Sequence, residues 1–172
     1  LERMRVPQAD EAQRFLANIV MSLPGHPLPR LWYLPNGKKA ILINTGDAEH
    51  MGGGQLDHTL NDAASYGASF TSYLMESGIA TTEPVKEASW RAAGHEIGPH
   101  VYAGGYETCD ALGLAYQQIV ANLQSRFGHG ARTARSHTGD WCGWSAMAAI
   151  EENYGTGMDL TYYHYFPRLM PY

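Results

Sequence analysis

Residues 38–50, KKAILINTGDAEH, determine how the rest of the chain is interpreted. Residues 40–43 are a short apolar run between two lysines and a Thr-Gly-Asp sequence, which predicts a strand that is covered on both faces. Asp47, Glu49 and His50 follow directly. Because ligands and reacting groups in parallel α/β folds lie just beyond the carboxyl ends of the strands, this stretch predicts a functional site.

Two of these side chains are acidic and two residues apart. In extended backbone, Asp47 and Glu49 would point to the same side of the strand and face a single metal ion. The alternative is that Gly46 and Asp47 form a turn and both acids are solvated, because Gly and Asp are common turn residues. These residues alone leave both interpretations open.

The composition limits the classes of function. The chain has 172 residues, of which 44% are apolar and 17% charged, and it is long enough to bury the core of one domain. A formal net charge of -5 argues against a nucleic-acid or anionic-membrane partner, because no basic stripe is present to neutralise phosphates. We expect no membrane span, since no apolar run approaches the roughly 18 residues required, and no secretory leader stands at the start.

The order of predicted elements indicates an α/β fold. Residues 1–39 are expected to form a helix over 10–21 and a proline-rich connector, both packed on a domain that comprises residues 40–172. Within that domain, strand-like and helix-like segments alternate, which implies parallel pairing through right-handed crossovers. The predicted strands are 40–43, 68–74, 95–101, 132–137 and 158–165, and the predicted helices are 56–66, 82–93, 108–127 and 145–153.

Two of these helices carry distinct terminal signals. Thr82 followed by Pro84 predicts an N-cap and a first turn, with an apolar face that contains Val85, Ala88 and Ala92. The longest helix, 108–127, has an apolar stripe with a 3.6-residue period and ends before Gly128. By contrast, the three glycines at 52–54 predict a flexible loop.

The predicted strand ends gather side chains that bind metals or transfer protons. Asp47 and Glu49 follow the first strand, His100 ends the third, and Arg135 and His137 lie at the fourth. Carboxylate and imidazole ligands from separate strand ends can form a divalent metal site with an open position. A single histidine at a strand end is more often structural, so the prediction depends on the whole set.

Residues 38–166 resemble polysaccharide deacetylases of the NodB-homology type, also called carbohydrate esterase family four. The resemblance is carried by residues 44–48 (NTGDA) where the family has T-F-D-D-G, 66–71 (YGASFT) at its helix-to-strand step, 94–100 (GHEIGPH) where it has G-H-E-I-G-N-H, and 135–139 (RSHTG) where it has R-P-P-Y-G. The segment 94–100 is the most specific of these matches.

The resemblance implies a distorted (β/α) barrel, a divalent metal such as zinc, and hydrolysis of an acetamide or ester on a sugar. In that scheme Asp47 takes the place of the family's base, and Arg135 holds that carboxylate ionised and oriented. A metal-activated water would attack the acetyl carbonyl.

The departures from the family concern the metal ligands. The family's second Asp falls on Ala48, and the second His of its H-x-x-x-H falls on Gly104. We expect a rebuilt site in which His137 joins His100, and Asp47 or Glu49 supplies the carboxylate. In an alternative register Asn44 replaces the leading Thr, and Asp47 is then a metal ligand with no base beside it.

The resemblance also predicts features around the site. Trp141 and Trp144 are candidates for stacking on sugar rings, or for capping the barrel rim. The family's last motif, L-x-H with the general acid, has no counterpart, so an incomplete barrel is expected; His164 is a candidate acid, although the aromatic residues around it favour a packed strand.

Two cysteines bear on the compartment. Cys109 and Cys142 follow the third and fourth strand ends, so a disulfide between these loops is expected if the protein is extracellular or periplasmic; two buried thiols are the alternative. The leading function is metal-dependent removal of an acyl group from a carbohydrate. The rivals are a non-catalytic carbohydrate-binding relative and an amidohydrolase that acts on a small non-sugar amide.

Overall fold

The computed structural model describes residues 8–23, 25, 35–105, 108–143 and 145–161. The chain divides into two compact units, residues 1–42 with 164–172 and residues 43–163. The first unit contains helix α1 (Gln8–Ser22), which covers the helix predicted at 10–21, and the short 3-10 helix η2 (Pro35–Gly37). Most of the predicted connector lies outside the described residues.

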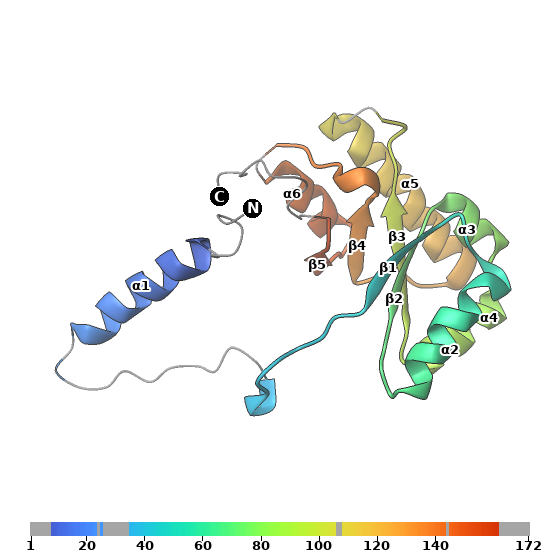
Figure 1. Ribbon diagram of the computed structural model, residues 1–172. Helices are drawn as coiled ribbons and strands as arrows, with labels where there is room; N and C mark the ends of the chain where they lie inside the picture. The colour runs from blue at the N-terminus through green and yellow to red at the C-terminus, as the bar shows by residue number, and fades with distance from the viewer. Residues whose placement is uncertain (1–7, 24, 26–34, 106–107, 144, 162–172) are drawn as a thin grey trace. The chain divides into compact units, whose positions relative to one another are not determined.

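The second unit is built on a five-stranded parallel sheet (Figure 1). The strand order follows the sequence, from β1 at one edge to β5 at the other, and every neighbouring pair is parallel. The strands are β1 (Thr45–Glu49), β2 (Thr71–Leu74), β3 (Glu96–Val101), β4 (Thr133–Ser136) and β5 (Met158–Asp159). This arrangement confirms the parallel α/β class that the alternating pattern predicted.

Helices connect successive strands and pack around a central helix. The connections are η3 (Gly53–Leu56), α2 (Asp57–Ser65), α3 (Glu76–Thr81), α4 (Pro84–Ala92), α5 (Cys109–Phe127), η4 (His137–Gly139) and α6 (Ala146–Asn153). Helix α5 contacts β3 and is flanked by α3, α4 and α6. The helix ends at Gly128 as predicted, with a φ of 78° at that residue, and Thr108 Oγ1 caps its start by accepting a hydrogen bond from Ala111 N.

The two faces of the sheet differ in polarity. The helix-facing side is apolar and joins α5 in one core, which includes Ala48, Leu74, Ile97, Val101, Ala134, Leu112, Tyr116, Ile119 and Leu123. Because successive strand residues point to opposite faces, the alternate positions lie on the inner face. These positions are mostly polar and include Asp47, Tyr73, Glu96, His100 and Arg135. The functional candidates therefore lie on the inner face.

The inner face is curved. Arg135 of β4 forms hydrogen bonds with Thr45 and Asp47 of β1, although β2 and β3 lie between these strands in the sheet. A flat sheet would hold β1 and β4 about three strand spacings apart, roughly 14 Å. The curvature therefore brings side chains from distant strands into one barrel-like interior.

The first strand was placed wrongly by the sequence pattern. The strand is Thr45–Glu49, so Asp47 and Glu49 belong to it, whereas residues 40–43 are outside any strand and Leu42 is 82% exposed. The turn interpretation of Gly46 and Asp47 is also wrong. The prediction assumed apolar neighbours on both faces. The inner face is polar, so the pairing segment alternates instead, with Ala48 in the core and Asp47 opposite.

The second predicted helix also needs correction. Helix α4 begins at Pro84, and its buried side chains are Glu87 and Trp90, whereas Val85 is 81% exposed. Thr82 is not its N-cap: it ends the unpredicted helix α3, and its hydroxyl donates to the carbonyl of Gly78. Val85, Ala88 and Ala92 face solvent because the buried Trp90, whose Nε1 donates a partly buried hydrogen bond to Asp57, sets the orientation of the helix.

Smaller differences occur elsewhere. The glycine-rich loop contains the 3-10 helix η3 rather than a flexible segment, and β2 is shorter than predicted. The predicted strand 158–165 is described only to Thr161. Cys109 and Cys142 form the expected disulfide, which joins the start of α5 to the loop after η4. No helix in the described ranges is both long and apolar enough to cross a bilayer.

Candidate metal centre

A bulge in β1 directs its two carboxylates to different partners. Asp47 is opposite Tyr73 and Glu49 is opposite Leu74, so one residue of β1 is left without a partner between them. Glu49 has a φ of 47°, in the left-handed region that glycine adopts more easily. The regular alternation that would have pointed both acids at one ion is therefore interrupted.

Asp47 is held by the guanidinium of Arg135. Arg135 Nη1 donates to Asp47 Oδ1 at 2.8 Å, and Nη2 donates to Thr45 Oγ1 at 2.8 Å. Arg135 Nε donates to the carbonyl of Leu160 at 3.2 Å. Arg135 Cζ lies over the ring of Tyr73, 5.0 Å from the ring centroid. Asp47 is thus oriented by a side chain that is itself held by Thr45, by the Leu160 carbonyl and by a cation–π contact.

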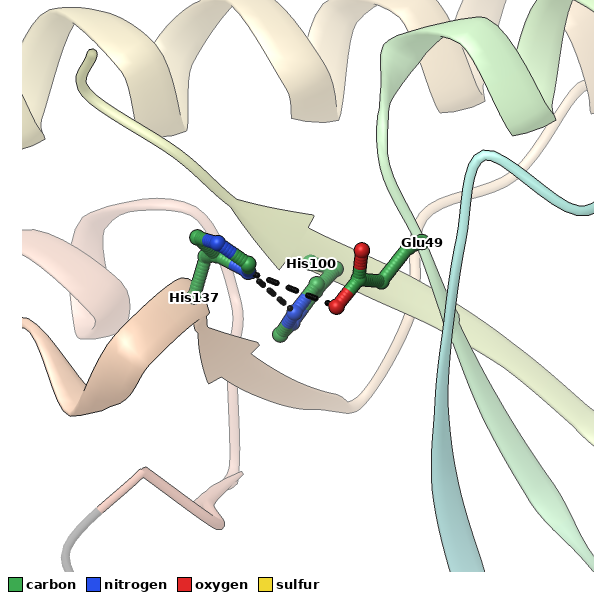
Figure 2. Close-up of side chains that lie close together, drawn as sticks. All are labelled: Glu49, His100 and His137. Atoms are coloured by element: carbon green, nitrogen blue, oxygen red, sulfur yellow. Dashed lines mark hydrogen bonds and ion pairs between the residues drawn. The ribbon is translucent and has the colours of Figure 1, made fainter.

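Three other side chains converge beside this pair (Figure 2). His100 Nε2 lies 3.1 Å from His137 Nδ1, and His137 Nδ1 lies 3.9 Å from Glu49 Oε1. The three candidate ligand atoms of Glu49, His100 and His137 all lie within 4.8 Å of one another. They come from β1, β3 and the segment that follows β4.

His100 has the protonation state that a metal ligand requires. Its Nδ1 lies 3.1 Å from the carbonyl of Arg135, which can only accept, so Nδ1 carries the proton and Nε2 presents its lone pair toward His137 and Glu49. Burial is the main cause that lowers the pKa of His100, although the charge of Asp47 opposes it. The neutral ring that metal coordination requires is therefore favoured.

The donor set fits a divalent metal. Imidazole nitrogens around tetrahedral zinc lie at about 2.0–2.1 Å from the ion, so two of them are about 3.3 Å apart. The 3.1 Å between the two imidazole nitrogens is close to that value. Two imidazoles and one carboxylate are also the ligand types of catalytic zinc sites that keep a fourth position for water.

A cavity of about 270 Å³ opens beside the pair formed by Asp47 and Arg135. Its lining is Asp47, Arg135, Ser136, Thr138, Gly139 and Leu160. The loop after β4 is shaped by Thr138, which has a φ of 55° and donates through its hydroxyl to Asp140 Oδ1 at 2.8 Å. The cavity is largely polar and suits a small polar group next to Asp47.

The structure brings most of the predicted site residues together. Asp47 and Arg135 form one group, and Glu49, His100 and His137 form the other. Asp47 is not one of the three grouped ligands. His50 instead forms a 2.6 Å hydrogen bond with Ser77 Oγ.

The predicted aromatic and acid residues are placed differently. Trp141 is partly buried and packs against the apolar core. Trp144 and His164 lie outside the described residues. Sequence reasoning missed Tyr73, which supports Arg135, and Tyr102, whose ring lies edge-on to His137 with centroids 4.9 Å apart. The alternation of inner and outer positions along β2 could have indicated Tyr73, had the polar face been recognised.

Comparison with known proteins gives structural matches only. No family model matches the sequence, and no curated protein matches it. Nineteen chains of solved structures align with it, and three of them illustrate the likeness. The pseudoenzyme BA3943 from Bacillus anthracis has 13% identity and a TM-score of 0.53, over 69% of this chain and 42% of that one. The family 4 carbohydrate esterase from Streptomyces lividans, solved with acetate, has 16% identity and a TM-score of 0.51, over 70% and 62%.

The third structure is the peptidoglycan deacetylase PdaC from Bacillus subtilis, with 13% identity and a TM-score of 0.53, over 68% of this chain and 55% of that one. At these identities the matches establish the fold, which is that of family 4 carbohydrate esterases. The matched region spans between 42% and 62% of the length of the three structures. The chain therefore contains a part of that barrel-like fold.

Proposed function

We propose that this chain carries the site of a metal-dependent hydrolase that removes an acyl group, such as acetyl, from a carbohydrate. The observation that carries the proposal is the separation of two carboxylates. Asp47 is bound by Arg135, whereas Glu49 lies with two histidines. A hydrolase of this type needs one group that takes a proton and a separate set that binds an ion. The fold shared with a carbohydrate esterase supports the same conclusion.

Each residue then has a defined role. Glu49, His100 and His137 would hold the ion, for which zinc matches the donor types. When bound, the ion would lower the pKa of a water molecule and polarise the acyl carbonyl. Asp47 would take the proton of the attacking water, because its carboxylate reaches the cavity in which the acyl group would bind. Arg135 keeps that carboxylate in one orientation, and the carbonyl of Arg135 fixes the ring of His100.

A second candidate is a non-catalytic carbohydrate-binding relative. Ala48 and Gly104 replace two ligands of the T-F-D-D-G and H-x-x-x-H motifs, and one of the matched structures is described as a pseudoenzyme. In that case the three grouped side chains would be a polar cluster without an ion. We also propose an extracellular or periplasmic location, which the disulfide supports because such bonds persist in oxidising compartments.

The decisive experiment measures zinc binding and hydrolysis on the same preparations. Isothermal titration calorimetry of the 172-residue chain with zinc should show one binding site. His137→Ala should weaken it strongly, while a matched substitution of an exposed acid, Glu152→Gln, should leave it unchanged. The zinc-loaded chain should release acetate from acetylated sugar oligomers.

Three results would overturn parts of the proposal. If the chain does not bind zinc, or if its zinc binding does not depend on His137, the proposed metal centre is wrong. A zinc-loaded chain that releases no acetate from any acetylated sugar would favour the non-catalytic relative. Turnover of small cyclic amides, without turnover of acetylated sugars, would indicate an amidohydrolase that acts on a small non-sugar amide.

A further inference from the structure

Tyr73 is a fully buried tyrosine directly beneath the candidate site. It lies on β2 with 0% exposure, and burial raises the pKa of its phenol to about 12, so the hydroxyl stays protonated. Its neighbour across the sheet is Gly98 of β3. A Cβ atom added to Gly98 would lie only 2.7 Å from the Tyr73 ring. The ring therefore rests against the backbone of β3, at a position that a larger residue would obstruct.

A chain of hydrogen bonds fixes the far end of the ring. Tyr73 Oη donates to Thr133 Oγ1 at 2.9 Å, and Thr133 Oγ1 donates to Glu96 Oε2 at 3.1 Å. Glu96 Oε1 accepts from the backbone nitrogens of Arg132 and Thr133 at 2.9 and 3.1 Å. The hydroxyl is thus anchored to β4 and, through Glu96, to β3.

Arg135 lies over the Tyr73 ring. The guanidinium carbon lies 5.0 Å from the ring centroid, within the range of a cation–π contact. The edges of the same guanidinium are used for Asp47, Thr45 and the Leu160 carbonyl. The ring of Tyr73 adds a fourth contact to these three bonds, so it helps to keep the guanidinium in place.

We propose that Tyr73 is a positioning residue whose ring holds the Arg135 guanidinium at the height where it can bind Asp47. The inference rests on the proposed function, because the Tyr73 ring acts through Arg135 to orient Asp47, the proposed base. Tyr73 does not reach the reacting atoms itself. Its effect passes through Arg135, and a misplacement of a catalytic group by about 1 Å can cost about a hundredfold in rate.

The test compares variants of Tyr73 with a matched buried tyrosine. Tyr73→Phe keeps the ring and removes only the bond to Thr133, whereas Tyr73→Leu removes the ring. Tyr116 serves as the control, since it is also 0% exposed and its hydroxyl meets a threonine, Thr156, on the helix-facing side of the sheet. Tyr116→Leu should lower stability without disturbing Arg135. If Tyr73→Leu does not fold, Tyr73→Met supplies a longer and more flexible ringless side chain.

Two measurements test whether the Tyr73 ring positions Arg135. The Nε–H resonance of Arg135, protected by its bond to Leu160, should carry a ring-current shift in ¹⁵N–¹H spectra. This shift should persist in Tyr73→Phe and disappear in Tyr73→Leu. In the zinc-loaded chain, kcat should fall about tenfold to a hundredfold in Tyr73→Leu with KM nearly unchanged, and by less than about threefold in Tyr73→Phe.

Specific results would overturn the inference. An Arg135 resonance that is unchanged in Tyr73→Leu, or an equal loss of kcat in Tyr116→Leu, would show that Tyr73 contributes only to the core. The spectroscopic result does not depend on turnover. An inactive wild-type chain would therefore reject the proposed function while the position of Arg135 is still decided.

Discussion

Asp47 and Glu49 are two residues apart on one strand, yet they belong to different halves of the site. The arginine-held half consists of Asp47 and Arg135, joined by a 2.8 Å ion pair. The histidine half consists of Glu49, His100 and His137, in which the side chain of Glu49 is 49% exposed and lies 3.9 Å from His137. The carboxylate of Asp47 is held in one orientation by Arg135, whereas the carboxylate of Glu49 keeps oxygen lone pairs that can bind a metal ion. A single bulge therefore divides two similar acids into a candidate base and a candidate ligand.

The sharpest way to break this comparison is Asp47→Asn. If Asp47 is the base, kcat/KM should fall by about 10²–10⁴-fold, because an amide cannot accept the proton. The zinc affinity should stay within about threefold of the wild-type value, since Asp47 is outside the histidine half. Steady-state kinetics and calorimetric titration of the same preparation check both values. A large loss of zinc affinity would make Asp47 a ligand and merge the two halves.

The disulfide tests whether the histidine half depends on its surrounding loops. Cys109 and Cys142 are 33 residues apart and connect the segments that follow His100 and His137. Replacing both by serine should lower the free energy of unfolding by about 2–4 kcal/mol, measured by denaturant titration. Zinc affinity should decrease, while the Arg135 resonance should keep its position. Equal disturbance of both halves would indicate that they are one rigid unit.

Glu49→Gln tests the ligand role directly. The zinc affinity should fall about 10–100-fold, because a neutral amide oxygen replaces a carboxylate. A matched substitution, Glu76→Gln, changes an acid on the neighbouring helix α3 that is outside the grouped side chains. Its zinc affinity should match that of the wild type. If Glu49→Gln binds zinc normally, the site relies on the two histidines and another donor.

The smallest expected effect concerns the support behind the arginine-held half. Glu151 on α6 is buried, and desolvation, followed by its contact with Asp159, raises its pKa to about 8. Asp159 precedes Leu160, whose carbonyl accepts from Arg135. Because the folded-state pKa lies above the ordinary value of 4.5, the stabilising contribution is complete below that value and is lost as the pH rises through about 8.

Stability measurements in mild alkali check this prediction. Between about pH 7 and pH 8, the wild-type chain should lose about 1 kcal/mol of unfolding free energy relative to Glu151→Gln, which mimics the protonated acid. Denaturant titrations of both proteins at the two pH values give the difference. A difference that does not change with pH would mean that Glu151 has an ordinary pKa.

Local signals explain why parts of the fold were predictable. The apolar period of α5, Thr108 at its start and Gly128 at its end act within a few residues, and the helix has the predicted bounds to within one residue. The strands β3 and β4 were also found, because short runs between helices leave few alternatives. The first strand was misplaced since its inner face is polar, and polarity of a barrel interior is a property of the assembled sheet.

The candidate site shows the same division. That Asp47, Glu49, His100, Arg135 and His137 are grouped at strand ends follows from residue type and spacing, because parallel strands present their carboxyl ends together. The family resemblance also paired Asp47 with Arg135 and His100 with His137. It left open whether Asp47 or Glu49 joins the histidines, since a bulge in β1 and the curvature of the sheet depend on contacts between distant strands. The ring of Tyr73 beneath Arg135 is a contact of this kind.

The order of residues in this chain is therefore sufficient to specify an α/β alternation, one long capped helix and a set of metal-binding and proton-transferring groups, because each depends on neighbours in sequence. The separation of base from ligands, and the aromatic support beneath the arginine, arise only when β1, β2 and β4 curve around a common interior. Packing of remote strands sets those distances, and no local pattern encodes them.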